Sequence, residues 1–397
     1  MRKYGLTMLA GVASLAIAGT ASAQTNIIRI TGSTAFRKAV HIAIGDILNA
    51  GYTYGYAGSA LSSAGQAEFR GSTKVGNYPV DIKTSFSGSV GGIQNLTRNL
   101  TVSTWLNGTN LTAGGTSGLT GPYDTPVTAD VTMSDSFQSS TAYTSPQLAG
   151  ALNNDGVVGV VPFQFVRNAG SPSSISNVTS LVAQALFGAG QINQSLFTGN
   201  NADESLQITL MGRDEDSGTR LESFAETGFG IFNAPFQYQP TISGTPGTGG
   251  VVTAYAPWPI NTVNGTTYPV GHSGYSSGGS LASAMNTPGS QSIGGGSNTS
   301  FIAYLGINDA STVTLGQTLT FNGVAYSTST VAEGQYTLWS YEHMYYRGTY
   351  SGNPQTIANQ IAQQIHDVEA VQSGQLLSTM QVGRSVEGGV ITSGSPY

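Results

Sequence analysis

The sequence predicts an α/β fold in which strands and helices alternate along the chain. Several short β-type runs are each followed by a small-polar turn and then by a segment with helical periodicity. Residues 156–166 form one long apolar run of the kind found in strands buried on both faces of a sheet. The 397 residues suffice for two ordinary domains or for one larger two-lobed unit.

The first unit consists of a strand at 26–31, the turn Gly32-Ser33-Thr34 and a helix over about 40–48. Gly32 permits a tight turn, and we expect Ser33 or Thr34 to cap the helix with its hydroxyl. Residues 51–77 are rich in Gly, Ser, Ala and Tyr, so we expect irregular surface there.

The second unit begins with the alternating strand 79–86, after which a turn containing Ser89 opens a helix. Residues 101–125 are rich in Gly, Thr and Asn and lack periodicity, which predicts an inserted surface loop. The next strand, 127–133, brings Asp135 to its C-terminal end.

The second half of the chain continues the alternation. A strand over 206–211 leads into Gly212-Arg213-Asp214-Glu215-Asp216-Ser217-Gly218-Thr219-Arg220 and then into a helix. Residues 240–270 are rich in Pro, Gly, Thr and Asn and predict a second insertion. The remaining predictions are helices at 148–154, 176–187, near 194, 277–285 and 354–371, strands at 300–305 and 336–341, and a hairpin-like pair at 313–321 and 324–327.

The stretch from Arg213 to Thr219 has the composition of an anion site at a helix N-terminus. The first N–H groups of a helix lack intrahelical partners and favour a negative group. Ser217 and Thr219 add hydroxyl donors, Gly218 allows close backbone approach, and Arg213 offers a planar fork for two oxygens. Taken alone, this stretch is equally consistent with a capped helix whose arginine pairs with the three adjacent acids.

Convergence of several such turns favours a ligand site over separate helix caps. In open α/β sheets, ligands bind outside the carboxyl ends of the strands. Four predicted strand ends carry only small polar residues, Arg or Asp, and we therefore expect them to meet at one oxyanion site.

Composition and charge narrow the function classes. Charged residues make up 9% of the chain, the formal net charge is −6, and no long basic block occurs, so we expect no nucleic-acid partner. Residues 1–23 contain a basic start, a short apolar core and Ala21-Ser22-Ala23, which predict an export signal cleaved near Ala23. The absence of cysteine excludes disulfides and an N-terminal lipid on Cys. These features predict a periplasmic or extracellular protein without a membrane span in the mature chain.

The motifs resemble those of PstS-like periplasmic phosphate-binding proteins, which belong to the two-lobed type II periplasmic binding proteins. The resemblance rests on Gly32-Ser33-Thr34, Gly88-Ser89-Val90-Gly91-Gly92, Ser134-Asp135 and Arg213 through Thr219, in that order. Weaker matches at 186–188, 302–304 and 335–338 extend it over nearly the whole mature chain. The family pattern has Asp where this chain has Glu215, and it lacks both insertions.

The resemblance implies a two-lobed fold with a hinge of crossing strands and a ligand cleft between the lobes. One lobe would take 24–160 and 300–397, and the other 161–299. It also implies capture of inorganic phosphate by a monomer, delivery to an ABC permease, and no catalytic residue, metal or cofactor. The implied phosphate ligands are Ser33, Thr34, Ser89, Asp135, Arg213, Ser217, Gly218 and Thr219.

Asp135 would provide the selectivity of this site. An ionised carboxylate only accepts hydrogen bonds, and phosphate near neutral pH still carries a proton to donate, whereas sulfate carries none. A buried carboxylate facing sulfate would cost several kcal/mol, which is how a site rejects a near-isostere. Arsenate is not separated from phosphate by this argument.

Two other functions remain open from the sequence. Gly274-Tyr275-Ser276-Ser277-Gly278 fits the nucleophile pattern of serine hydrolases, although a Gly- and Ser-rich chain yields about one such match by chance. The low charge and the two insertions would also suit a secreted surface or matrix protein that kept this fold. The four histidines have no metal-ligand spacing: His41, His272, His343 and His366.

Overall fold

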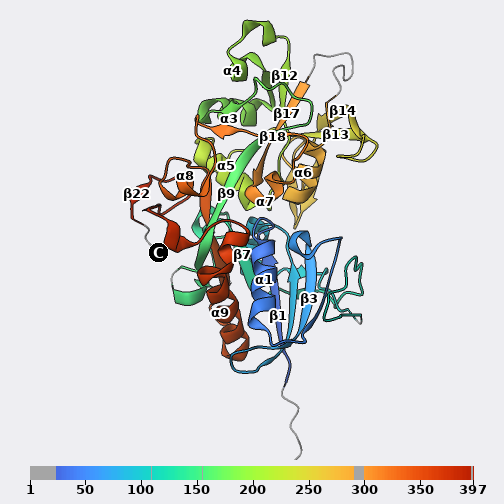
Figure 1. Cartoon of the computed structure of the whole chain (residues 1–397), viewed down its shortest axis with the longest axis vertical. Helices are drawn as coiled ribbons and strands as arrows, with labels where there is room; N and C mark the ends of the chain where they lie inside the picture. Colours follow the sequence, from blue (N-terminus) through green and yellow to red (C-terminus); the bar gives the residue numbers. More distant parts are fainter. Residues whose placement is uncertain (1–23, 109, 154, 290–298, 395–396) are drawn as a thin grey trace, which may run out of the picture.

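The computed structural model describes residues 24–108, 110–153, 155–289, 299–394 and 397. The predicted export signal, 1–23, lies outside the described residues. Figure 1 shows an elongated molecule with two halves, one built around β1, α1 and α9 and the other around β12, β17 and α3. None of the described helices has the length and apolar character needed to cross a bilayer.

One mixed sheet of twelve described strands runs through both halves, in the order β11-β12-β17-β9-β20-β7-β1-β4-β3-β2 with β8 and β18 paired at its side. Its strands are β1 (Asn26–Gly32), β2 (Thr53–Tyr56), β3 (Gln66–Ser72), β4 (Pro79–Ser85), β7 (Val131–Ser134), β8 (Leu148–Gly150), β9 (Val157–Arg167), β11 (Gln191–Asn193), β12 (Gln207–Leu210), β17 (Thr299–Gly306), β18 (Gln317–Thr318) and β20 (Trp339–Arg347).

The central strand β9 connects the two halves, as Figure 1 shows. Its first part pairs with β20, from Val157 to Pro162, and its second part pairs with β17, from Phe163 to Arg167. All eleven of its residues are buried. The apolar run at 156–166 is therefore explained by the position of β9, which is covered on both faces of the sheet and paired at both edges.

Helices cover the sheet in both halves. In the β1 half, α1 and α9 lie side by side (Figure 1), and α2 packs on β7 and β1. In the β12 half, α3 packs on α5, where the rings of Phe187 and Phe224 are 4.9 Å apart. The helices are α1 (Arg37–Ile47), α2 (Ser89–Arg98), α3 (Ser180–Ala189), α4 (Ser195–Thr198), α5 (Gly218–Thr227), α6 (Gly278–Met285), α7 (Ile307–Ala310), α8 (Thr328–Ala332) and α9 (Gly352–Asp367).

The segment 101–125, predicted as an inserted loop, covers the edge of the main sheet. Tyr54 on the edge strand β2 exchanges backbone hydrogen bonds with Thr112, and the N–H of Tyr56 donates to Thr116 at 2.9 Å. The N–H groups of Gly118 and Leu119 donate to carbonyls of Gly58 and Tyr56. The loop therefore satisfies edge groups that would otherwise face water.

The second predicted insertion, 240–270, consists mainly of hairpins. Strands β13 (Tyr238–Ser243) and β14 (Val251–Pro257) form one, and β15 (Asn261–Val263) and β16 (Thr266–Tyr268) form the other. Asn264, at the tip of the second hairpin, donates to Gln94 on α2 at 2.9 Å. The remaining small pairs are β5 (Thr101–Val102) with β6 (Val127–Thr128), β10 (Asn177–Val178) with β19 (Thr320–Phe321), and β21 (Val382–Gly383) with β22 (Thr392–Ser393).

Some sequence predictions of local structure are wrong. At the predicted hairpin-like pair 313–321 and 324–327, β18 pairs with β9 and β19 pairs with β10 instead. The stretch 51–77 is not irregular, because it holds β2 and β3 with the buried Phe69 between sheet and helices. Residues 148–153, the described part of the predicted helix 148–154, do not form an α-helix: β8 is followed by a short 3₁₀ turn, in which Leu152 has a φ of 58°.

Candidate functional site

Arg213 lies at the centre of the predicted site. It follows β12, is 1% exposed, and donates from Nε to the carbonyl of Tyr275 at 2.9 Å. A terminal nitrogen, Nη2, donates to the carbonyl of Ser276 at 3.1 Å and to the hydroxyl of Thr34 at 3.3 Å. Among the described residues, no carboxylate lies within ion-pair distance of Arg213. The side chain is therefore a buried, oriented cation that makes no close ion pair within the described part of the chain.

The N-terminus of α5 stands next to Arg213, as the sequence predicts. Ser217 is the N-cap, and its hydroxyl accepts a hydrogen bond from the N–H of Arg220 at 3.2 Å. Gly218 and Thr219 form the first turn and are buried. This places the positive end of a helix dipole beside the guanidinium.

Asp135 faces this helix end from the β1 half. It follows β7 and is 1% exposed, and its N–H donates to the hydroxyl of Ser89 at 3.2 Å. A Cβ added to Gly218 would lie 1.4 Å from Oδ1 of Asp135 and 2.7 Å from Cβ of Ser89. Within the described residues, Oδ1 has no hydrogen-bond partner. Burial raises the pKa of Asp135 to about 6, opposed by the Ser89 hydroxyl and by Arg213.

Ser33 and Thr34 reach the site but do not cap a helix, so that prediction is wrong. Helix α1 begins later, at Arg37, and its N-cap position is Phe36 without a side-chain hydrogen bond. Thr34 instead accepts from Arg213, and the Ser33 hydroxyl forms a hydrogen bond of 3.2 Å with Oε2 of Glu342. Both hydroxyls are therefore directed to side chains of the site.

The N-terminus of α2 meets the α5 loop across the two halves. The N–H groups of Val90 and Gly91 donate to the carbonyl of Asp216 at 3.0 and 3.2 Å. Gly88 has a φ of 108°, and a Cβ there would lie 2.3 Å from the same carbonyl oxygen. Ser89 is buried between these contacts and Asp135. Four predicted strand ends thus converge, as the sequence analysis expects.

The three consecutive acids do not neutralise Arg213. Glu215 accepts from the hydroxyl of Ser273 at 2.8 Å and from the amide of Asn261 at 3.0 Å. Burial raises the pKa of Asp214 to about 8 and that of Asp216 to about 6. Neighbouring carboxylates add to both shifts, and the charges of Arg213 and Arg220 oppose both. Arg213 therefore makes no hydrogen bond or close ion pair with Asp214, Glu215 or Asp216, although its charge acts on Asp214 and Asp216.

Sequence reasoning missed two buried glutamates behind the site. Glu342 lies on β20, and Glu222 lies on α5, where its Oε1 accepts from the hydroxyl of Ser136 at 3.1 Å. Burial and the charge of Asp135 raise the pKa of Glu342 well above its usual range. The pKa of Glu222 is also raised well above its usual range, by burial first, then by the charge of Glu387 and then by that of Asp135. Each keeps one oxygen without a hydrogen-bond partner in the described structure.

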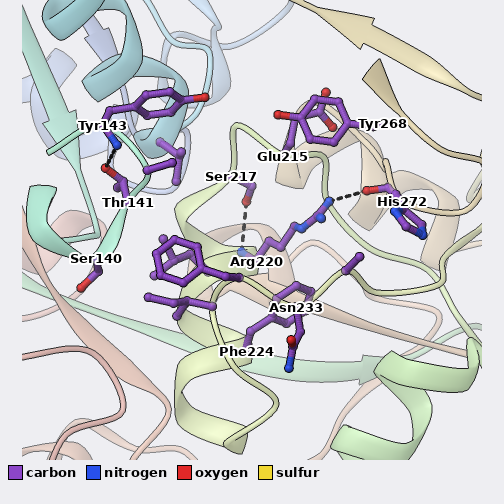
Figure 2. A pocket seen from close by; sticks show the side chains of 16 residues that line it. Ser140, Thr141, Tyr143, Glu215, Ser217, Arg220, Phe224, Asn233, Tyr268 and His272 are labelled. Atoms are coloured by element: carbon purple, nitrogen blue, oxygen red, sulfur yellow. Dashed lines mark hydrogen bonds between the residues drawn. The ribbon is translucent and has the colours of Figure 1, made fainter. Parts of the chain in front are cut away.

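Cavities lie on two sides of the predicted residues. Figure 2 shows one of about 230 Å³, between the α5 N-terminus and the loop carrying Thr141 and Tyr143. Arg220 crosses it and donates to the carbonyl of His272 at 2.9 Å. Of the predicted site residues, only Ser217 lines this cavity, whereas Thr34 lines a larger groove with Arg37, whose Nη2 pairs with Asp309 at 2.9 Å.

The placement of Ser276 does not reproduce a hydrolase nucleophile. Tyr275 before it makes a single bridge to Arg213, and Ser277 after it caps α6. The carbonyl of Ser276 accepts from Arg213. In the described part of the chain, no hydrogen bond joins the Ser276 hydroxyl to an imidazole. The motif therefore serves to hold Arg213 and to start a helix.

The chain has a two-lobed α/β fold of the kind found in periplasmic binding proteins. No protein-family model and no curated protein matches the sequence. Among solved structures, the chain is similar to a protein from Clostridium perfringens assigned as a phosphate ABC transporter substrate-binding protein, with bound phosphate. That match has 13% identity and a TM-score of 0.50, and it covers 88% of this chain and 99% of the other.

A second similar structure is an ABC-type phosphate transport receptor from Vibrio cholerae, at 12% identity and a TM-score of 0.46, covering 88% of this chain and 99% of that one. A third is PstS from Borrelia burgdorferi, at 13% identity and a TM-score of 0.40, covering 88% and 98%. At these identities the likeness to the first structure establishes the fold.

Proposed function

We propose that this chain is an exported solute-binding protein that captures inorganic phosphate between its two lobes. One observation carries the proposal. Among the described residues, a buried guanidinium with no close ion pair and a buried carboxyl oxygen with no hydrogen-bond partner lie at one helix N-terminus. The first requires an anion and the second requires a hydrogen-bond donor. A protonated oxyanion supplies both.

Each predicted ligand has a distinct role in this proposal. Arg213 supplies the counter-charge, and N–H groups and hydroxyls of Ser217, Gly218 and Thr219 supply neutral donors at the α5 N-terminus. Thr34, Ser33 and Ser89 add hydroxyls from the β1 half. Asp135 accepts the proton of the ligand and disfavours sulfate, because an unpaired buried carboxylate facing sulfate is costly.

Lobe closure would bring these residues around the ligand. We propose lobes of 24–160 and 161–299, with the C-terminal region returning to the first lobe. Strand β9 is the first crossing segment in this proposal. The motif resemblance would put the second crossing at 300–306. Because β17 pairs with β12 and with the second part of β9, its pairing favours a second crossing after α7 instead. Delivery of phosphate to an ABC permease, export through residues 1–23 and a monomeric state belong to the same proposal.

Calorimetric titration of the phosphate-stripped mature chain tests the function. We expect micromolar or tighter phosphate binding that sulfate does not displace. In Asp135→Asn the amide can donate as well as accept, so the affinity for sulfate relative to that for phosphate should rise by roughly tenfold or more. Asp46→Asn is the control, because Asp46 is an exposed carboxylate on α1.

The alternatives predict different results. Absence of heat and of thermal stabilisation by phosphate, arsenate and sulfate would contradict the proposal and favour a surface or matrix protein on the same fold. Equal affinity for phosphate and sulfate in the wild type would contradict the role of Asp135 while retaining an oxyanion site. Titration with arsenate tests whether the site distinguishes phosphate from arsenate by size, because the proton accepted by Asp135 does not distinguish them.

A further inference from the structure

Ser33 can serve a ligand only through its hydroxyl. Its N–H donates to the carbonyl of Met133 at 2.9 Å, so the backbone donor is already used. The hydroxyl lies 3.2 Å from Oε2 of Glu342, and both residues are 0% exposed. Whether the Ser33 hydroxyl presents its proton or a lone pair to a ligand therefore depends on whether Glu342 is protonated.

The surroundings of Glu342 favour its neutral form. It lies on β20 between β9 and β7, and its Oε1 has no partner among the described residues. The charged group acting on it is Asp135 after β7, a carboxyl of the same sign. The positive charges of the site interact electrostatically with other carboxyl groups. Arg213 interacts with Asp135, and Arg384 interacts with Glu222 and Glu387. The adjacent His343 turns its Nδ1 to the carbonyl of Asp155 at 3.1 Å.

We propose that Glu342 is a specificity-determining residue that, while protonated, donates to Ser33 and thereby frees the Ser33 hydroxyl to donate to the bound oxyanion. This inference rests on the proposed phosphate function. When Glu342 ionises, its carboxylate accepts a hydrogen bond from the Ser33 hydroxyl, and a serine lone pair then faces the ligand. The site loses one donor and gains a negative charge nearby, so affinity for an oxyanion falls.

The proposal predicts the sign of a pH effect. Burial, followed by Asp135, raises the pKa of Glu342, so ionisation occurs on the alkaline side of the ordinary glutamate range. Phosphate affinity should therefore fall as pH rises through the ionisation of Glu342. The fall should be about tenfold, the size expected for losing one hydrogen bond to a charged ligand.

The decisive experiment compares phosphate affinity against pH in wild type, Glu342→Gln, Ser33→Ala and the double variant. Glutamine is a permanently neutral donor, so Glu342→Gln should bind phosphate about as well as wild type at neutral pH and lose the alkaline fall. In the Ser33→Ala background, Glu342→Gln should have no further effect. Glu222→Gln is the matched control, because this buried glutamate bonds Ser136 instead; its alkaline fall should remain.

Infrared spectroscopy of the ligand-free protein separates this inference from the proposed function. A protonated-carboxyl band near neutral pH that disappears in Glu342→Gln and shifts in Ser33→Ala would support the hydrogen bond independently of phosphate. If wild type binds phosphate and Glu342→Gln keeps the alkaline fall, the inference is wrong and the function stands. If the band is present but no oxyanion binds, the proposed function is wrong and the role given to Glu342 falls with it.

Discussion

Oδ1 of Asp135 lies so close to Gly218 that a Cβ on this glycine would come within 1.4 Å of it. The contact joins the loop after β7 to the first residue of α5, so it connects the two halves of the molecule. Ser89 borders the same spot, with its Cβ 2.7 Å from that position. A side chain at 218 thus cannot be accommodated without moving a helix or a buried carboxyl.

The first prediction concerns this contact. Gly218→Ala should weaken phosphate binding by at least about a hundredfold, because the methyl group prevents Asp135 and the α5 N-terminus from approaching each other. Titration calorimetry measures the loss. Gly114→Ala is the control, since a Cβ at this exposed position meets nothing within 4 Å. Wild-type affinity in Gly218→Ala would show that the ligand does not bind at this helix end.

The second prediction concerns the pH dependence of stability. Burial, with Asp216 and Glu215 adding to it, raises the pKa of Asp214 to about 8. The folded state therefore holds this proton more tightly than the unfolded state, in which the pKa is near 3.8. The ligand-free protein should lose stability as pH rises from about 4 to about 8, by on the order of a few kcal/mol.

Thermal unfolding against pH checks this effect in Asp214→Asn, which should show a smaller decline because asparagine stays neutral. Asp367→Asn provides a control of opposite sign. A hydrogen bond from His366 lowers the pKa of Asp367, so its small contribution is lost as pH falls. An unchanged decline in Asp214→Asn would mean that other groups, such as Asp81 or Asp216, carry the dependence.

The third prediction concerns the buried ion pair between Arg384 and Glu226 on α5. The two side chains are 1% and 6% exposed, and the guanidinium carbon of Arg384 lies 3.9 Å from the centre of the Trp339 ring. Arg384→Ala should lower the free energy of unfolding by about 3–5 kcal/mol, because it leaves Glu226 buried without its partner. Chemical denaturation measures the change.

A less buried pair provides the comparison. Arg29 and Asp124 are each 17% exposed, so Arg29→Ala should cost about 1 kcal/mol or less. Adding Glu226→Gln to Arg384→Ala should recover part of the loss, since the orphaned charge is then removed. Equal costs for the two arginine substitutions would contradict the role of burial.

Short residue patterns predicted where the helices at and near the site begin. Ser217 and Ser277 cap their helices as the residue pattern indicates, because a cap depends on a few neighbouring residues. Glu342, by contrast, could not be predicted from a local pattern. It sits in an aromatic strand, and its partner Ser33 is 309 positions away, so no sequence pattern marks it as buried or as part of the site.

Tertiary pairing also explains the missed strands. The stretch 51–77 as a whole is rich in Gly, Ser, Ala and Tyr, yet β3 within it pairs along its whole length with β4. The pairing buries Glu68 and Lys83, whose charged atoms lie 3.5 Å apart. Such a strand is stabilised by its neighbours rather than by its own propensity.

The cover that residues 101–125 place over β2 has a consequence for behaviour at high concentration. An uncovered edge strand can pair with the same strand of another molecule, and proteins commonly prevent this with lysine or other charges. Charged residues make up only 9% of this chain, so electrostatic repulsion between copies is weak. Shortening the loop should therefore turn β2 into a point of self-association, with intermolecular sheets growing from a fold that remains otherwise intact.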